Sequence, residues 1–257
     1  MPVSAGSADT VRQPQAPVPL LLRTFGGLSL AGSPAADTFS ETRRKPLGLL
    51  ALLAGAADRG LSREKLGAYL WPEGDSEKVR GVLKQTLYSI RQELDPELIQ
   101  GTVDLRLNPA VIDCDTWQFD RLATAGDLAG AAEQYHGPFL DGIHLPDAPG
   151  FEHWVDDQRD HYARKFSGII EKLARAAMGR NEPRDAMEWW RRLTEFDPLD
   201  VRAVSGLLHA CLQAGDRPRA IRYAERHMTL LRKELEITPD PEIRRLVEQA
   251  RARPGGA

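Results

Sequence analysis

Basic, amide and hydroxyl side chains gather in one segment of the chain, between residues 75 and 91. Its candidates for contact with a nucleic acid are Lys78, Arg80, Lys84, Gln85, Tyr88, Ser89 and Arg91. Lysine and arginine donate hydrogen bonds to the guanine acceptors of the major groove, and glutamine pairs with adenine. The segment holds four basic residues against two acidic ones. If it forms a helix, its polar face has the chemistry of DNA base recognition. The alternative is an ordinary solvated helix face.

Two further basic features accompany this segment. Arg43, Arg44 and Lys45 form a run of three consecutive cations, and Arg106 is the basic residue of the stretch from 99 to 113. Contacts to phosphates position a protein on DNA without reading its sequence, and the triplet suits that role. Arg106 suits a phosphate or the minor groove. Surface solubility is the competing interpretation of the triplet.

Large aromatic residues and a histidine–aspartate group offer other chemistries. The aromatic side chains considered for a ligand cleft are Tyr135, Phe139, Trp154, Trp189 and Trp190. At helical spacing such residues are more typical of a core. His153 and His161 lie two helical turns apart, roughly 12 Å, which is too far to share one metal ion. The sequence shows no phosphate-binding glycine loop and no nucleophile–base constellation. We therefore predict no enzymatic activity, no cofactor and no metal site.

A small α/β domain is predicted around the basic segment. Residues 20–30 alternate partly about Gly26-Gly27, which indicates a strand or hairpin. Helices are expected to begin near Pro46, at Ser62 as N-cap, and at Asp75 or Ser76.

The third of these helices has the clearest pattern. Its apolar residues follow each other at steps of four, four, three and four: Val79, Leu83, Leu87, Ile90 and Leu94. Pro96 ends the helix, and residues 99–113 are predicted to form a hairpin that turns near Asn108-Pro109. A strand, three helices and a hairpin are the order of a winged helix-turn-helix, in which the third helix enters the major groove.

Beyond Asp115 the pattern is helical throughout. Residues 173–196 realign on residues 207–230 at an offset of 34, which superposes Leu173 on Leu207, Ala176 on Ala210, Ala177 on Cys211 and Ala186 on Ala220. That offset is the tetratricopeptide period. Residues 126–131 echo residues 215–220 more faintly. A long helix is expected over 151–178 and a last one over 241–252.

The fold class predicted is mainly α: a winged helix-turn-helix of the α+β kind, followed by an all-α tetratricopeptide-like domain. We expect a disordered tail over 1–19, the winged helix over 20–113 and the helical domain over 114–252. The 257 residues carry a formal net charge of −3, so any DNA-binding surface must be a local patch. The sequence has no secretory signal or apolar span, and Cys114 and Cys211 lack metal-ligand spacing. We expect a cytoplasmic protein with reduced cysteines.

Several stretches resemble a known family. Those in the C-terminal part are YHGPFLDG (135–142), FEHWVDDQRDHY (151–162), Asp197-Pro198, AGDRPRAIRYAERH (214–227) and LRKELEITPDPEI (231–243). They resemble the bacterial transcriptional activation domain of AfsR-like antibiotic regulatory proteins, the SARP family. Those in the N-terminal part are RRKPLGLLALLA (43–54), LSREKLGAYLWPE (61–73) and VLKQTLYSIRQEL (82–94). They resemble the OmpR-type winged helix that precedes this domain in the family. The resemblance implies two partners, double-stranded promoter DNA and RNA polymerase.

Two functions remain open at this point. The first is a sequence-specific transcriptional activator, favoured by the apolar stripe of the third helix and the nearby cations. Its neutral winged helix would bind DNA weakly alone, so a homodimer on repeated half-sites is expected to supply affinity. The second is a protein-interaction scaffold with a degenerate winged helix, favoured by the lack of net positive charge, by Ser89 and Gln92, and by the short wing.

Overall fold

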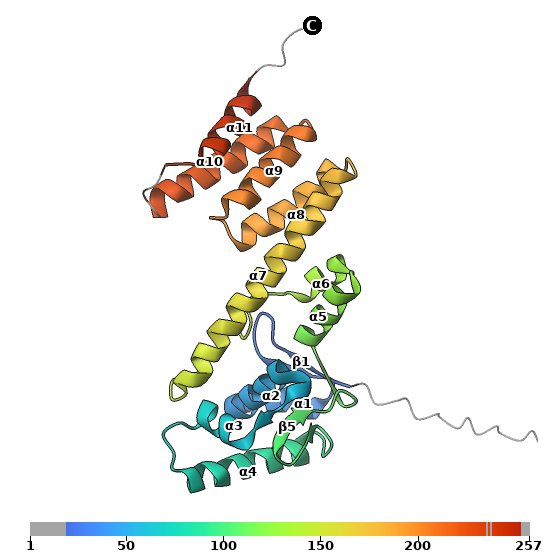
Figure 1. Cartoon of the computed structure of the whole chain (residues 1–257), viewed down its shortest axis with the longest axis vertical. Coiled ribbons are helices and arrows are strands. Elements are labelled where there is room, and N and C mark those ends of the chain that lie inside the picture. Colours follow the sequence, from blue (N-terminus) through green and yellow to red (C-terminus); the bar gives the residue numbers. More distant parts are fainter. Residues whose placement is uncertain (1–18, 235, 237, 253–257) are drawn as a thin grey trace, which may run out of the picture.

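The computed structural model describes residues 19–234, 236 and 238–252, so the predicted tail lies outside them except for Pro19. The molecule is elongated (Figure 1). A compact N-terminal part occupies one end, a single long helix leads away from it, and shorter helices stack at the other end. Among the described residues, no helix has the length and apolarity that crossing a bilayer requires.

Two small sheets and four α-helices make up the N-terminal part. In the first sheet, β1 (Leu20–Arg23) pairs antiparallel with β2 (Ser29–Ala31) and parallel with β6 (Ile112–Cys114). In the second, β5 (Asp104–Leu107) lies between β3 (Leu61–Ser62) and β4 (Ile99–Gln100). The helices are α1 (Pro34–Thr42), α2 (Arg44–Ala56), α3 (Arg63–Leu70) and α4 (Ser76–Glu93), with a 3-10 turn, η1 (Ala57–Arg59), after α2.

Side chains cap the starts of α3 and α4, and the cap at Ser62 is the one predicted from the sequence. Ser62 accepts a hydrogen bond from the backbone N–H of Lys65 at the start of α3, and Asp75 accepts one from Lys78 at the start of α4. These side chains satisfy backbone donors that a helix start leaves free, which confirms both predicted helix starts.

The structure adds one helix to those predicted and corrects one turn. The added helix is α1, which Ser33 caps and which buries Ala36 and Phe39. The hairpin of the wing turns between β4 and β5, not near Asn108-Pro109, because Gly101 there adopts a positive φ of 96°. The chain at 108–110 instead crosses to β6 in the other sheet.

Seven helices form the rest of the described chain. They are α5 (Asp115–Ala125), α6 (Leu128–Gln134), α7 (Pro149–Gly179), α8 (Pro183–Phe196), α9 (Val201–Gln213), α10 (Arg217–Glu234) and α11 (Pro241–Arg251). From α5 onward each helix packs on the next. The predicted fold class, a winged α+β part followed by tetratricopeptide-like helices, is confirmed.

The 34-residue repeat is visible in the turns before α8 and α10. In the first turn the N–H groups of Arg180, Asn181 and Glu182 donate to the carbonyls of Ala176, Met178 and Ala177. In the second turn the N–H groups of Ala214, Gly215 and Asp216 donate to the carbonyls of Ala210, Leu212 and Cys211. Every donor and acceptor is displaced by the same 34 positions. Ala186 and Ala220 are both buried, whereas Ala176 is exposed and Ala210 buried, so the equivalence fails at that pair.

A buried carboxylate joins the two parts of the chain. Asp115, at the start of α5, accepts hydrogen bonds from the Thr24 N–H (2.7 Å), the Thr24 hydroxyl (2.5 Å) and the Phe25 N–H (2.9 Å). Its side chain is almost fully buried. Burial, and the charge of Asp115 beside it, raise the pKa of the Cys114 thiol to about 12. The thiol is thereby kept protonated and unreactive.

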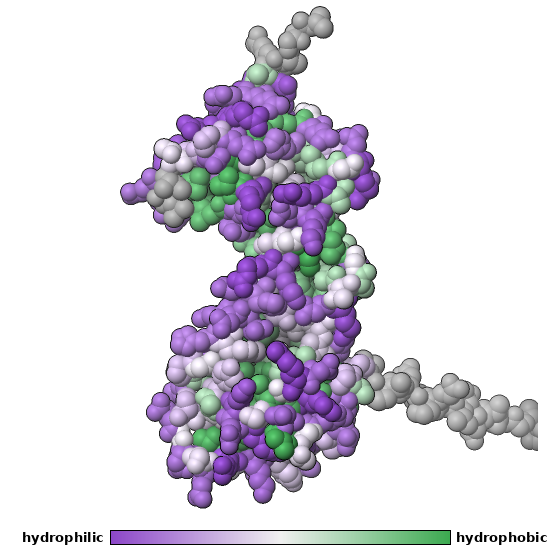
Figure 2. Space-filling model, in the orientation of Figure 1, coloured by the Kyte–Doolittle hydropathy of each residue, from purple (hydrophilic) through white to green (hydrophobic). Residues whose placement is uncertain are grey.

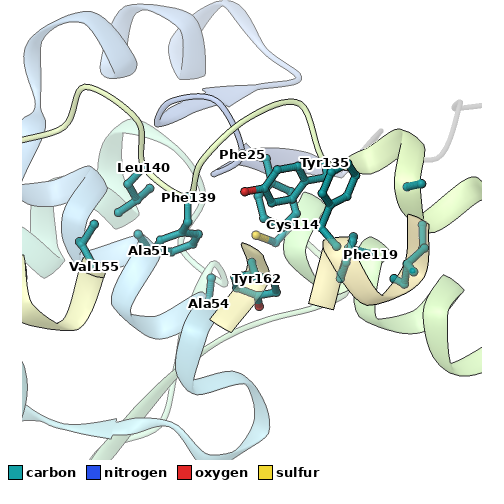
Figure 3. Close-up of a cluster of buried hydrophobic side chains, with 14 of the residues drawn as sticks. Phe25, Ala51, Ala54, Cys114, Phe119, Tyr135, Phe139, Leu140, Val155 and Tyr162 are labelled. Carbon is teal, nitrogen blue, oxygen red and sulfur yellow. The ribbon is translucent and has the colours of Figure 1, made fainter. Parts of the chain in front are cut away.

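Aromatic rings pack around Phe25, whose N–H donates to this carboxylate (Figure 3). The ring of Phe25 lies 4.9 Å from that of Tyr135, 5.1 Å from Tyr162 and 5.6 Å from Phe119, between centroids. The buried residues form one continuous cluster from β1 to α11. The predicted boundary after residue 113 falls inside β6, and the division into two folding units stays a prediction.

The carboxylate of Asp115 can be tested by an isosteric change. Asp115→Asn presents an amide group to donors that need an acceptor, and should lower the free energy of unfolding by about 1–3 kcal/mol in denaturant titrations. Asp58→Asn, at an exposed aspartate of η1, is the control and should change it by less than about 0.5 kcal/mol. Equal stability of the two variants would contradict a stabilising role for the hydrogen bonds that Asp115 accepts.

The repeat can be tested by overpacking. Ala220→Trp inserts a large ring where α10 packs closely and should destabilise the protein by about 1–3 kcal/mol or more. Ala176→Trp, at an exposed alanine of α7, should have little effect. The measurement is the melting temperature of both variants in thermal unfolding. An unchanged melting temperature for Ala220→Trp would refute close packing at this position.

Candidate nucleic-acid interface

Helix α4 lies at the end of the molecule furthest from the stacked helices (Figure 1). Leu83, Leu87 and Ile90 are buried, which confirms the predicted apolar stripe, and Val79 is half-buried. Five of the predicted contact residues share the exposed side of the helix: Lys78, Arg80, Lys84, Gln85 and Tyr88. Tyr88 is 59% exposed. Figure 2 shows mainly hydrophilic residues at this end of the molecule.

Two glycines set how closely α3 and α4 approach. A Cβ atom on Gly67 would lie 2.6 Å from a methyl group of Val79, and one on Gly74 would lie equally close to the other methyl. Both positions therefore exclude larger residues unless Val79 moves. This contact fixes the direction in which the first turn of α4 leaves the domain.

The basic triplet does not act as one patch. Arg43 forms an ion pair with Glu93 at the end of α4, at 2.9 Å. Lys45 lies 5.9 Å from the centre of the Trp71 ring and lines a groove that Lys78 also borders, near the start of α4. Arg44 is exposed. The three cations thus diverge toward both ends of α4, and the charge of Arg43 is already partly compensated.

Backbone contacts hold the wing against the helices. Arg91 donates to the carbonyl of Ile99 at 3.0 Å, and Arg63 donates to the carbonyl of Thr102 at 3.1 Å. Arg91, predicted as a DNA contact, is half-buried by this interaction, and Ser89 is half-buried as well. Arg106 is exposed on β5, between two buried leucines.

Sequence reasoning missed three residues near this surface. Val82 is 38% exposed on α4, and Val103 is 74% exposed in the turn of the wing. Val82 lies outside the 79–83–87 steps of the apolar stripe, so the spacing in the sequence could have indicated that its side chain is exposed. Nothing in the sequence indicated that Arg63 would anchor the wing, because the bond joins residues 39 positions apart.

The other chemistries considered from the sequence are a metal site and an aromatic ligand cleft. Among the described residues, no group of three or more histidine, cysteine or acidic side chains is arranged to hold a metal ion. The aromatic residues considered for a ligand cleft are buried or half-buried, as predicted for a core.

Residues 114–251 match the family model described as bacterial transcriptional activator domain. The chain belongs to this family. The resemblance to AfsR-like regulators is thereby confirmed. The match to the activator domain begins where β6 ends, so α4 and the wing precede the matched residues.

A solved structure shares the fold. EmbR from Mycobacterium tuberculosis, determined in complex with a low-affinity phosphopeptide, matches with a TM-score of 0.61 at 20% sequence identity. The match covers 90% of this chain and 64% of the EmbR chain. It therefore extends over the winged part as well as the activator domain. No curated protein matches the sequence.

The register of α4 can be tested by placing a charge on either side of it. Leu83→Asp would bury a carboxylate without a partner in a small core and should abolish cooperative unfolding of the winged part. Lys84→Asp, one residue further on and exposed, should leave folding intact. Circular dichroism and thermal melts provide the measurement, and cooperative folding of Leu83→Asp would show that the register is wrong.

Proposed function

We propose that the chain is a sequence-specific transcription regulator that inserts α4 into the major groove of promoter DNA. The observation that carries this proposal is the two-sided nature of α4: an apolar side packed in the core and an exposed side bearing Lys78, Lys84 and Gln85. The major groove of B-DNA admits one helix, and these side chains pair with guanine and adenine. Membership of the transcriptional activator family supports the same role.

The cations around α4 would contact phosphates. We assign this role to Arg44, Lys45, Arg80 and Arg106, with Tyr88 and Ser89 at the edge of the groove. Arg43 could join them by leaving Glu93, and Arg91 would act mainly by holding the wing. Few free cations remain, so one copy would bind weakly. A homodimer on repeated half-sites would raise the affinity through effective concentration.

The helical part, residues 114–252, would provide the contact with RNA polymerase in the cytoplasm. Its packed repeats share one buried cluster with the winged part and are joined to it through Asp115. The scaffold function is retained as the second candidate because Arg43 and Arg91 are engaged within the protein. In that case the helical part would bind another protein, and α4 would not contact DNA.

A salt series of binding measurements distinguishes these functions. We would select bound duplexes from a random pool, then measure wild type, Lys84→Ala and Arg44→Ala on selected and random DNA. Lys84→Ala should weaken binding to the selected site by about 1–3 kcal/mol and relax its sequence preference, because it removes a base contact. Arg44→Ala should weaken binding to all duplexes alike and reduce the salt slope by about one.

Glu97→Ala, an exposed residue beyond the end of α4, is the control and should bind as wild type does. Binding that is undetectable for every variant at low salt would refute the DNA proposal and leave the scaffold function.

A further inference from the structure

A small cavity lies between α8, α9 and α10, far from α4. Its volume is ≈ 140 Å³. For comparison, an enclosed apolar cavity of about 150 Å³ accommodates benzene. Among its lining residues are Pro198, Val204, Leu207, Tyr223, Arg226 and His227. The walls thus combine apolar side chains with two nitrogen-bearing ones on α10.

The imidazole of His227 is only partly satisfied. The side chain is buried, and its Nδ1 lies 3.0 Å from the carbonyl oxygen of Pro198. A carbonyl only accepts, so Nδ1 carries the proton of this bond. The other nitrogen, Nε2, is buried and has no hydrogen-bond partner among the described residues. Buried polar atoms without partners are rare and destabilising.

The repeat shows that packing alone does not require a histidine here. At the offset of 34, His227 corresponds to Leu193 on α8, which is also buried. The first repeat fills this position with an apolar side chain. The second repeat instead places an imidazole there, beside the cavity.

Arginine occupies the neighbouring position in both repeats, but its contacts differ between them. Arg192 on α8 donates to the carbonyl of Ala132 and lies 5.3 Å from the centre of the Phe166 ring. Its equivalent on α10, Arg226, is exposed and borders the cavity. The guanidinium of Arg226 has no hydrogen-bond or ion-pair partner among the described residues. Its donors are therefore available to an acceptor from outside the chain.

The remaining charges of the cavity wall are balanced. Glu195 pairs with Arg191 at 2.5 Å, and Arg191 also pairs with Glu188 at 2.9 Å. Arg226 therefore leaves the site with an unbalanced positive charge. Val204 and Leu207, both buried, form an apolar surface beside it.

We propose that this cavity binds a small apolar carboxylic acid, either free or as the carboxyl end of a peptide. The carboxylate accepts hydrogen bonds from the guanidinium of Arg226 and, when the imidazole is cationic, from Nε2 of His227. The apolar group packs against Val204 and Leu207. This site is independent of DNA binding and makes the helical repeats responsive to a ligand.

The test measures the binding of a matched pair of probes to the full chain. Calorimetry gives the affinity, and NMR of the imidazole nitrogens reports on His227. N-acetyl-leucine should bind saturably and shift the His227 resonances, whereas N-acetyl-leucinamide, which lacks the carboxylate, should bind at least about tenfold more weakly. A hexapeptide ending in leucine, with a free or an amidated carboxyl group, distinguishes the sources. Tighter binding of the free-ended peptide than of N-acetyl-leucine indicates a peptide end, and the reverse indicates a free acid.

Three variants test whether N-acetyl-leucine binds in this cavity. His227→Leu, which installs the residue of the first repeat, and Arg226→Gln should each weaken binding at least about tenfold. Arg222→Gln, an exposed arginine one turn earlier on α10, should bind as wild type does. Arg226→Gln decides alone if His227→Leu fails to fold. Absence of saturable binding to wild type, or wild-type affinity in Arg226→Gln, would overturn the proposal.

Discussion

The buried carboxylate of Asp115 is the interaction on which the arrangement of this molecule depends. It has no cationic partner in the described part of the chain and is held by the backbone and hydroxyl donors of Thr24 and by the N–H of Phe25. A charge removed from water must be satisfied by such donors, and their directions leave little freedom. The end of β1 is therefore fixed to the first turn of α5, and the aromatic rings around Phe25 pack about this joint.

A second contact extends this constraint to the long helix. Arg159 on α7 donates to the carbonyls of Phe139 and Leu140, and the Leu140 N–H donates to Thr24. The segment between α6 and α7 is thus held between the first strand and α7. The winged part is therefore joined by hydrogen bonds to α7, which leads to the helical repeats, and α4 lies at the opposite side (Figure 1). This arrangement would separate the DNA surface that we propose on α4 from the helical repeats.

The repeats show how a regular architecture acquires a specific site. The turns before α8 and α10 make the same hydrogen bonds, so the two helices begin at equivalent positions of the repeat. Substitutions at equivalent positions, such as histidine for leucine at His227, then change chemistry without changing the backbone. A departure from the repeat at a buried position is consequently more informative than a polar residue on the surface.

The sequence by itself determined the elements whose signals are local. Four features depend on residues close in the chain and were predicted correctly: the apolar steps of α4, the cap at Ser62, the start of α4 at Asp75 or Ser76, and the 34-residue repeat. Within the repeat, the predicted equivalence fails at the pair Ala176 and Ala210. The tertiary structure alone decided which cations of the candidate site remain free, because Arg43 and Arg91 meet partners that periodicity does not specify. It also decided the turn of the wing and the joint at Asp115. The bond from Asp115 spans 91 residues, and contacts at such separations leave no periodic trace in a single sequence.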